Sequence, residues 1–487
     1  MEEAPPGANI IGSKWVLKAK KDTASNIIHY KARLIAQGFS QISGVDYNNT
    51  YEPVAKLAST CAIITMANCL GFKMHQIDIK GAYLNGKLQD NEVLYMQHPL
   101  GYKSLDAGTC ILCLVRTLYG LKQSGRRWYQ KLSSIFKSLR FMQCGVGQAI
   151  YFKVIVSKGK LTVMVVHVDN CTIVVNNTHL IVKLKVGLSK HFKVTDLGEL
   201  HWMLSIEVKR DCPSHLVHLS QHMYIKAICR RYNLTNLKPL STPMDHQVCL
   251  SSDQAPISTA ECTMMCDIPY HKAVGALNWA ILAMQPDIAF AVSMVARFAS
   301  NPGLAHWEAV KRIFHYLFGT CDLWFTYGET SMPLEGYTDA DGSMAKDCHT
   351  IPGYAFLIDG GAILWSSKQQ EIVSLSTTKS DYVVAMHGSK EALWLYSLIS
   401  KVFGPITSPT TLFSDNQAAI ALTHDHQYYL RTKHINVQYH WIRWVVEKGS
   451  ICLVYCPTDD MVANALTKAL PSAKVKHFAT SLGLCAK

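Results

Sequence analysis

The segment LTVMVVHVDNCTIVV, residues 161–175, joins two apolar runs through His167, Val168, Asp169 and Asn170. Apolar runs rich in β-branched residues favour buried strands, so we expect a β-hairpin with these four residues at its tip. Burying an unpaired carboxylate is costly, and a carboxylate beside an amide at a strand tip suits a metal site. An Asp-Asn pair is also a common turn dipeptide, so this segment alone fits an ordinary hairpin equally well.

A second acidic strand tip lies earlier, in MHQIDIKGAYLNG, residues 74–86, where Asp78 follows a strand-like run and leads into Tyr83 and a turn. In this order, the two tips resemble the first and third conserved blocks of the reverse transcriptase palm, in the version carried by copia-type LTR retrotransposons. Further blocks that resemble this family follow in its order over nearly the whole chain. They are KWVLKAKKD (14–22), YKARLIAQGFSQISGVDY (30–47), EPVAKL (52–57), LYGLKQSGRRWY (118–129), DLGEL (196–200), LSTPM (240–244) and QPDIAFAVSMVARFASNP (285–302).

The C-terminal part resembles the ribonuclease H domain that follows the polymerase in copia-type elements. The resemblance implies a mixed sheet with helices, in which four acidic residues gather around two Mg²⁺ ions. Asp339 and Asp415 keep two of these positions, whereas Asp381 stands where the family has Glu and Asn464 stands where it has Asp. The blocks that carry this resemblance are LEGYTDADG (334–342), STTKSDYVVAM (376–386), LFSDNQAAIAL (412–422), RTKHINVQYHWIRWVVEKG (431–449) and MVANALTK (461–468).

For the polymerase site, the resemblance implies that Asp78 and Asp169 are the principal ligands of two Mg²⁺ ions, with Mn²⁺ as an alternative metal. Hard dications of this kind are held by carboxylate oxygens. The family carries a second Asp where this chain has Asn170, so one negative charge is missing. At an effective dielectric of about 20, a charge pair at about 4 Å is worth roughly 4 kcal/mol, which is an upper guide to the weakened metal binding.

The same resemblance assigns residues to nucleotide binding. Arg33, with Lys31 as the weaker candidate, would meet the incoming triphosphate, since a guanidinium fork matches phosphate oxygens. Tyr83 is similar to the aromatic residue that closes on the sugar 2′ position and excludes ribonucleotides, although a core aromatic would also fit its context. Gln123 would back the templating base pair.

The expected fold is α+β. A right-hand reverse transcriptase, with fingers, palm and thumb, is followed by a ribonuclease H-like mixed α/β domain. We place the fingers and palm at 8–245, a mainly helical thumb or connection at 246–330, and the ribonuclease H-like domain at 331–475. Within the second part, HWEAVKRIFHYLFG (306–319) has apolar residues at helical spacing and ends on Gly319, which predicts one helix.

Composition agrees with nucleic acid as the partner. The chain has 48 Lys and Arg against 35 Asp and Glu, a net charge of +13, which favours a polyanion. Six basic residues and one acid, Asp22, fall in 14–33, which suits either a surface against phosphates or a merely solvated basic face. The partners that we expect are an RNA template, a DNA primer, the RNA–DNA hybrid and deoxynucleoside triphosphates.

Other classes of protein are disfavoured. The 16 cysteines include a single CxxC, Cys110 and Cys113, and we interpret them as reduced, buried thiols rather than a zinc site. The first residues lack the features of a signal peptide, which favours an intracellular protein, in a cytoplasmic virus-like particle or the nucleus. The apolar region 273–298 contains Gln285 and Asp287, so we expect core helix and no membrane span. We recognise no zinc knuckle, integrase or protease block, as expected for the downstream end of a polyprotein.

Several positions depart from the family pattern. Gly125 replaces a usual Pro, Ser205 a usual Gly, Gly147 an Asp, and Lys379 an acid. Together with the changes at the two metal sites, these departures resemble the drift of an element copy no longer selected for transposition. Three hypotheses follow: an attenuated reverse transcriptase with an even weaker ribonuclease H, an inactive relic that still binds hybrids, and a host-recruited protein that binds nucleic acid.

Overall fold

The computed structural model describes residues 5–21, 26–101, 111–234, 238–328, 333–341, 351–368, 376–406, 408–424 and 441–486. Asp22, Cys110 and the segment 431–440 therefore lie outside the described residues. The chain forms two compact units. The first consists of Met1–Ala55 and Lys73–Glu199, and the second of Lys56–Phe72 and Leu200–Lys487.

The first unit is built on a six-stranded antiparallel sheet in the order β11-β4-β10-β9-β8-β7. The hairpin expected at 161–175 is confirmed, because β9 and β10 pair antiparallel and place Asn170 opposite His167. The strands of the six-stranded sheet are β4 Lys73–Ile79, β7 Met142–Cys144, β8 Gly147–Ile155, β9 Lys160–His167, β10 Asn170–Val175 and β11 Val194–Glu199.

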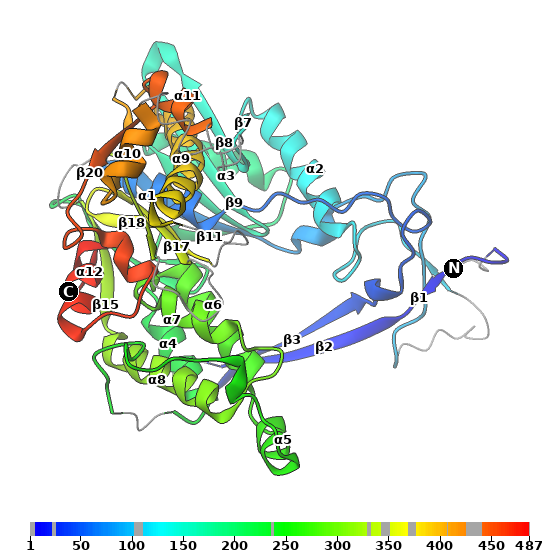
Figure 1. The fold of residues 1–487 in the computed structure, drawn as a ribbon. Helices are drawn as coiled ribbons and strands as arrows, with labels where there is room; N and C mark the ends of the chain where they lie inside the picture. The colour runs from blue at the N-terminus through cyan, green and yellow to red at the C-terminus, as the bar shows by residue number, and fades with distance from the viewer. Residues whose placement is uncertain are drawn as a thin grey trace. The chain divides into compact units, whose positions relative to one another are not determined.

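One face of this sheet is buried against helices α2, Ser124–Ser138, and α3, His179–Ser189 (Figure 1). The sequence of α2 explains its orientation, because Trp128, Leu132 and Ile135 recur at helical spacing and are all buried. They pack in one core with apolar residues of β4, β9 and β10.

The start of the chain forms a separate two-stranded sheet in this unit. Strands β2, Ser13–Lys21, and β3, Ile27–Ala36, make a two-stranded antiparallel ribbon (Figure 1). At its end, Gly120 has a φ of +95°, and a Cβ there would lie 2.1 Å from the carbonyl oxygen of Ala36. Only glycine fits this crossing, which fixes the loop before α2 against the end of the ribbon. A three-stranded sheet, β1 Ile10–Ile11, β5 Tyr95–Met96 and β6 Leu112–Cys113, completes the unit.

The second unit contains two five-stranded sheets. The first has the order β12-β13-β14-β15-β21, from Trp202–Met203, Ile206–Asp211, Leu216–Ser220, Leu323–Tyr327 and Leu484–Ala486. The helices before its fourth strand are α1 Leu57–Cys69, α4 His222–Arg231, α5 Thr259–Cys266, α6 Tyr270–Ala283, α7 Ala289–Ala296 and α8 Leu304–Thr320.

Two expectations about these helices are confirmed. The predicted helix at 306–319 is α8, which ends one residue after Gly319 and buries Val310, Ile313 and Leu317. The apolar region 273–298 is core helix, divided into α6 and α7 near Pro286. In the described part of the chain, no helix is long and apolar enough to cross a membrane.

The second sheet has the order β18-β17-β16-β19-β20 and mixes antiparallel with parallel pairs. Parallel neighbours need crossover connections, which α9, Thr377–Phe403, and then α10, Gln417–His424, and α11, Trp441–Glu447, supply. The mixed sheet with helices is therefore confirmed. Its strands are β16 Glu335–Asp341, β17 Ile351–Ile358, β18 Gly361–Ser367, β19 Thr410–Ser414 and β20 Ile451–Tyr455. Short helix η8, Val462–Leu466, and α12, Ser472–Ser481, follow it.

The cysteines of the described residues are free, but the expectation that they are buried is wrong for several of them. These thiols lie in turns and loops, at a helix end, on α5 and on β20, where side chains reach solvent. The exposed ones are Cys69, Cys212, Cys249, Cys262, Cys266 and Cys452.

Candidate functional site

The first candidate site lies where the β9–β10 turn meets β4. Asp78 pairs in register with Asn170, and the backbone N–H of Ile79 donates to the carbonyl oxygen of Asp169 at 2.8 Å. Burial, followed by the charges of Asp169 and Asp78, raises the pKa of the Cys171 thiol to about 12. The structure thus brings the two acidic strand tips together on neighbouring inner strands, at the end of the sheet where β4 ends and β10 begins.

The turn that carries Asp169 is strained and supported from below. Val168 has a φ of 58°, a left-handed conformation that β-branched residues rarely adopt and that costs about 1–3 kcal/mol. The indole N–H of Trp128 on α2 donates to the Val168 carbonyl oxygen at 2.8 Å, and Val168 packs against the core. Trp128 therefore positions the turn, a role that its place in the LYGLKQSGRRWY block did not reveal.

The altered position at the hairpin tip keeps a hydrogen-bonding pattern that suits a carboxylate. The side-chain oxygen of Asn170 accepts a hydrogen bond from Nε2 of Gln76 at 3.0 Å. Gln76 and Asp78 are two residues apart on β4 and so lie on the same face of the sheet. An aspartate at position 170 could accept the same hydrogen bond from Gln76.

Arg33 and Tyr83, which lie far apart in the sequence, come together around Tyr119. The Arg33 guanidinium carbon lies 5.2 Å from the centroid of the Tyr119 ring, and the Tyr83 and Tyr119 rings meet edge to face at 5.4 Å. Burial raises the pKa of Tyr119, with smaller contributions from the charges of Asp169 and Asp78. Tyr119, which sequence reasoning missed, therefore links the candidate nucleotide-binding residues to the carboxylates.

Glu52 is a second residue of this cluster that sequence reasoning missed. The Tyr83 hydroxyl donates to Oε2 of Glu52 at 3.4 Å, and burial is the main cause of the raised pKa of Glu52. A Cβ at Gly125 would lie 1.9 Å from the same carboxylate oxygen. The change from Pro to Gly at position 125 is thus matched by a carboxylate that fills the space.

The two remaining nucleotide-binding candidates lie in different surroundings. Gln123 is fully buried: its Oε1 accepts from Nε2 of Gln41 at 3.0 Å, and its Nε2 donates to the Asp46 carbonyl oxygen at 2.9 Å. Any contribution of Gln123 to template binding would therefore be indirect. Lys31 pairs with Lys18 across the β2–β3 ribbon, and like charges directly opposite one another favour an anionic partner.

The second candidate site is an acidic triad in the second unit. Asp339 lies on β16, Asp381 on α9 and Asp415 directly after β19, with carboxylate oxygens of all three within 4.8 Å of one another. Burial is the largest cause of the raised pKa of Asp381, to about 7, and the charges of Asp339 and Asp415 add to it. Because a cation would relieve this repulsion, the donor set fits a divalent metal ion.

The fourth position of the ribonuclease H pattern has a different environment. Asn464, at 2% exposure, donates from Nδ2 to the Thr458 carbonyl oxygen at 2.6 Å, and its Oδ1 is buried without a hydrogen-bond partner among the described residues. An aspartate here would direct a carboxylate oxygen at a carbonyl oxygen. In contrast to Asn170, Asn464 stands in a place that no longer suits a carboxylate.

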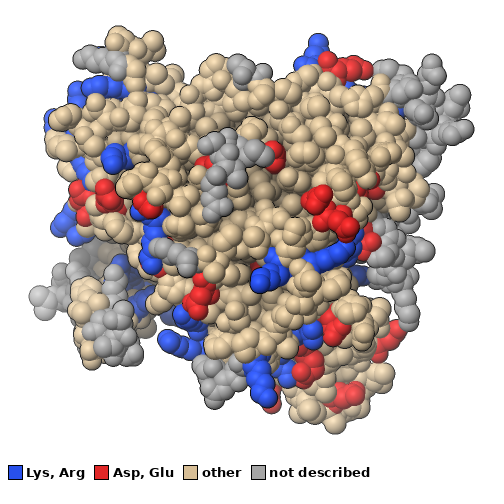
Figure 2. Space-filling view, turned by 90° about the vertical axis from the view of Figure 1, so that its left-hand side faces the viewer, with Lys and Arg blue, Asp and Glu red and all other residues tan. Residues whose placement is uncertain are grey.

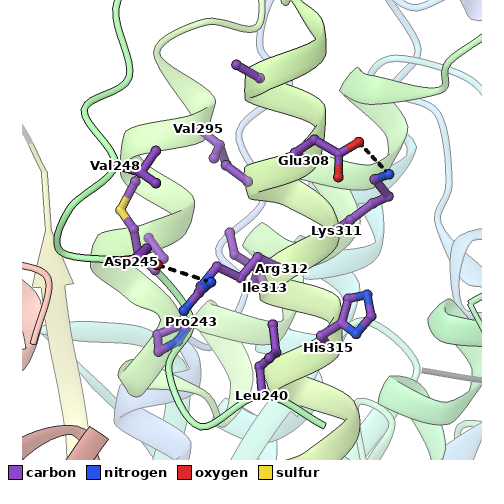
Figure 3. Close-up of a pocket in the computed structure, with 14 residues that line it drawn as sticks. Leu240, Pro243, Asp245, Val248, Val295, Glu308, Lys311, Arg312, Ile313 and His315 are labelled. Carbon is purple, nitrogen blue, oxygen red and sulfur yellow. Dashed lines mark ion pairs between the residues drawn. The ribbon is translucent and has the colours of Figure 1, made fainter. Parts of the chain in front are cut away.

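A pocket in the second unit lies away from the acidic triad's residues. It has a volume of about 520 Å³ and lies between α7, α8 and the segment 240–248, with ion pairs Asp245–Arg312 and Glu308–Lys311 at its edge (Figure 3). None of the candidate catalytic residues lines it. Figure 2 shows a face on which Lys and Arg are interspersed with Asp and Glu, so the net positive charge does not form one basic patch there.

Comparison with known proteins identifies the family. The model of the family described as reverse transcriptase (RNA-dependent DNA polymerase) matches residues 1–246. The retrovirus-related Pol polyprotein from transposon TNT 1-94 of Nicotiana tabacum is 39% identical over 99% of this chain, and the retrovirus-related Pol polyprotein from transposon RE1 of Arabidopsis thaliana is 33% identical over 99%. The chain spans 36% and 32% of the length of these two relatives.

Among solved structures, prototype foamy virus protease-reverse transcriptase is 9% identical to this chain, with a TM-score of 0.23. The match covers 95% of this chain and 52% of that chain. The family match and the relatives confirm the resemblance that the sequence blocks showed. The chain belongs to the reverse transcriptase family and is similar over nearly its whole length to copia-type retrotransposon Pol polyproteins.

Proposed function

We propose that this chain is an attenuated RNA-directed DNA polymerase that copies an RNA template from a DNA primer with deoxynucleoside triphosphates. The observation that supports this most is that Asp78 on β4 lies next to the strained turn that carries Asp169, in a chain of this family. We assign fingers and palm to 8–245, thumb or connection to 246–330, and a ribonuclease H-like domain to 331–475.

In the polymerase site, Asp78 and Asp169 would hold Mg²⁺ or Mn²⁺ ions, with Asn170 offering only a neutral oxygen. Bound ions of this kind lower the pKa of the primer 3′-hydroxyl and neutralise the triphosphate. Arg33 would bind triphosphate oxygens from the ribbon, with Lys31 beside it. The paired rings of Tyr83 and Tyr119 would contact the sugar, and so favour deoxynucleotides.

In the second unit, we propose cleavage of the RNA strand of an RNA–DNA hybrid. The buried Asp339 and Asp381 and the partly exposed Asp415 would hold a divalent metal ion, which would supply charge stabilisation at the scissile phosphate. Asn464 is neutral and so contributes no fourth carboxylate to the site. We therefore expect the nuclease to be weaker than the polymerase. We place both proposed activities inside the cell, in a cytoplasmic particle or the nucleus.

A second candidate function is binding of nucleic-acid hybrids without catalysis, in a relic or a protein recruited by the host. The environment of Asn464 supports this alternative, because its side-chain amide donates to the Thr458 carbonyl oxygen and brings no negative charge to the triad.

Primer extension on a poly(rA)/oligo(dT) hybrid separates these functions. The chain is compared with Asp78→Ala and Asn170→Asp, in Mg²⁺ and separately in Mn²⁺. Extension that Asp78→Ala abolishes supports the polymerase and its ligand assignment. Extension only by Asn170→Asp shows an intact fold with one defective ligand position, and no extension by any version, with hybrid binding retained, supports the binding function.

A further inference from the structure

One segment of the chain, residues 458–468, supplies several hydrogen-bond donors and one positive charge to the acidic triad. The Thr458 hydroxyl donates to Oδ2 of Asp415 at 2.9 Å, and the Thr467 hydroxyl donates to Oδ2 of Asp339. The Lys468 ammonium lies 3.7 Å from the same Asp339 oxygen. This segment therefore provides part of the compensation that metal ions would otherwise give.

We propose that Lys468 acts as a built-in cation of the triad, and that the triad consequently binds one divalent ion instead of two. The proposal rests on the nuclease function proposed above. It differs from the family resemblance, which implies two ions at this site. It concerns the second unit alone.

Hydrogen bonds from the protein already occupy four of the six carboxylate oxygens of the triad. Both oxygens of Asp381 accept hydrogen bonds, Oδ1 from the N–H of Ala340 at 3.0 Å and Oδ2 from Nδ2 of Asn416 at 2.8 Å. Oδ2 of Asp339 and Oδ2 of Asp415 each accept from a threonine. Among the described residues, Oδ1 of Asp339 and Oδ1 of Asp415 accept no hydrogen bond, which leaves them as the oxygens best placed to bind an ion.

A second ion would lack its usual ligands. It would need an oxygen on the Oδ2 side of Asp339, where Lys468 places an ammonium, and a dication there would be repelled. It would also need a fourth carboxylate, and Asn464 is neutral, with its Nδ2 bonded to the Thr458 carbonyl. Both obstacles come from the same segment, so replacing Lys468 removes only one of them and tests it separately.

The test counts Mn²⁺ ions on the full chain, by calorimetric titration and by electron paramagnetic resonance of free Mn²⁺. Ions at the triad are the difference between the unmodified chain and Asp339→Asn, with Asp415→Asn as a second reference if the first variant fails to fold. We expect a difference of one ion. In Lys468→Met we expect the single ion to bind at least tenfold more tightly, because the competing ammonium is gone while Asn464 still supplies no fourth carboxylate. The matched control is Lys474→Met, since the Lys474 ammonium pairs with the exposed Asp459 at 2.9 Å and not with a carboxylate of the triad.

A difference of two ions in the unmodified chain would overturn the proposal, as would a difference of zero. An unchanged count and affinity in Lys468→Met would do so too, as would a change of equal size in the control. Cleavage of an RNA–DNA hybrid, measured on the same preparations, reports separately on the nuclease function. One bound ion without cleavage would leave this inference standing and refute the proposed nuclease.

Discussion

Replacing Asp381 by Asn should remove one source of pH dependence from the stability of the second unit. Burial and the neighbouring charges of Asp339 and Asp415 raise the pKa of Asp381 from 3.8 to about 7. A shift of about 3 units corresponds to roughly 4 kcal/mol at 1.36 kcal/mol per unit. Because the pKa in the folded state is the higher one, this stability is fully present below about pH 4 and is lost as pH rises through about 7.

Asp381→Asn removes the ionisation but also a hydrogen bond. The new amide oxygen can still accept from the N–H of Ala340, whereas its NH₂ group would face the NH₂ group of Asn416, at a cost of about 1 kcal/mol. In the absence of metal, the variant should therefore be less stable than the unmodified chain by about 1 kcal/mol near pH 3, about equally stable near pH 4.5, and more stable by up to about 3 kcal/mol at pH 8.

Scanning calorimetry from pH 3 to 8, without added metal and with a chelator, checks this. For large domains, about 1 kcal/mol shifts Tm by roughly 2–4 °C, so the order of the two melting temperatures should reverse between these pH values. Saturating Mn²⁺ at pH 8 should raise the Tm of the unmodified chain more than that of the variant, since only the unmodified chain offers the third carboxylate. Parallel curves, or a variant that remains less stable at pH 8, would refute the reasoning.

Three further outcomes are expected. Trp128→Phe should lose the bond to the Val168 carbonyl and destabilise the first unit by about 1 kcal/mol in urea titration, with a larger fall in primer extension than in hybrid binding. Asn464→Asp should not restore nuclease activity and should lower stability by about 1–3 kcal/mol at pH 8, because a buried carboxylate would face a carbonyl, so hybrid cleavage at the family's usual rate would contradict this. Gly125→Ala should displace the Glu52 carboxylate and lower the ratio of kcat/KM for deoxynucleotides over ribonucleotides, and the change should vanish in a Glu52→Ala background.

Local pattern was enough to place the acidic strand tips and α8, because the apolar spacing of these segments fixes both the element and its buried face. Family resemblance brought Asp339, Asp381 and Asp415 together before any geometry was known. The pattern did not reveal the role of Tyr119, because its contacts with Arg33 and Tyr83 join segments remote in sequence. For the same reason, it gave no sign that the departure at position 125 has a structural partner.

The two amides at the candidate metal sites also differ in what evolution could do with them. An Asn codon becomes an Asp codon by one base change, so both lost carboxylates are equally near in the genetic code. At position 170 the donor Gln76 stands ready for the carboxylate, and a reverting mutation would meet no obstacle from the fold. At position 464 the Thr458 carbonyl would oppose it, and the same mutation would need a second, compensating change. The proposed polymerase site could therefore recover its second Asp by a single mutation, whereas the proposed nuclease site could not recover its fourth carboxylate so simply.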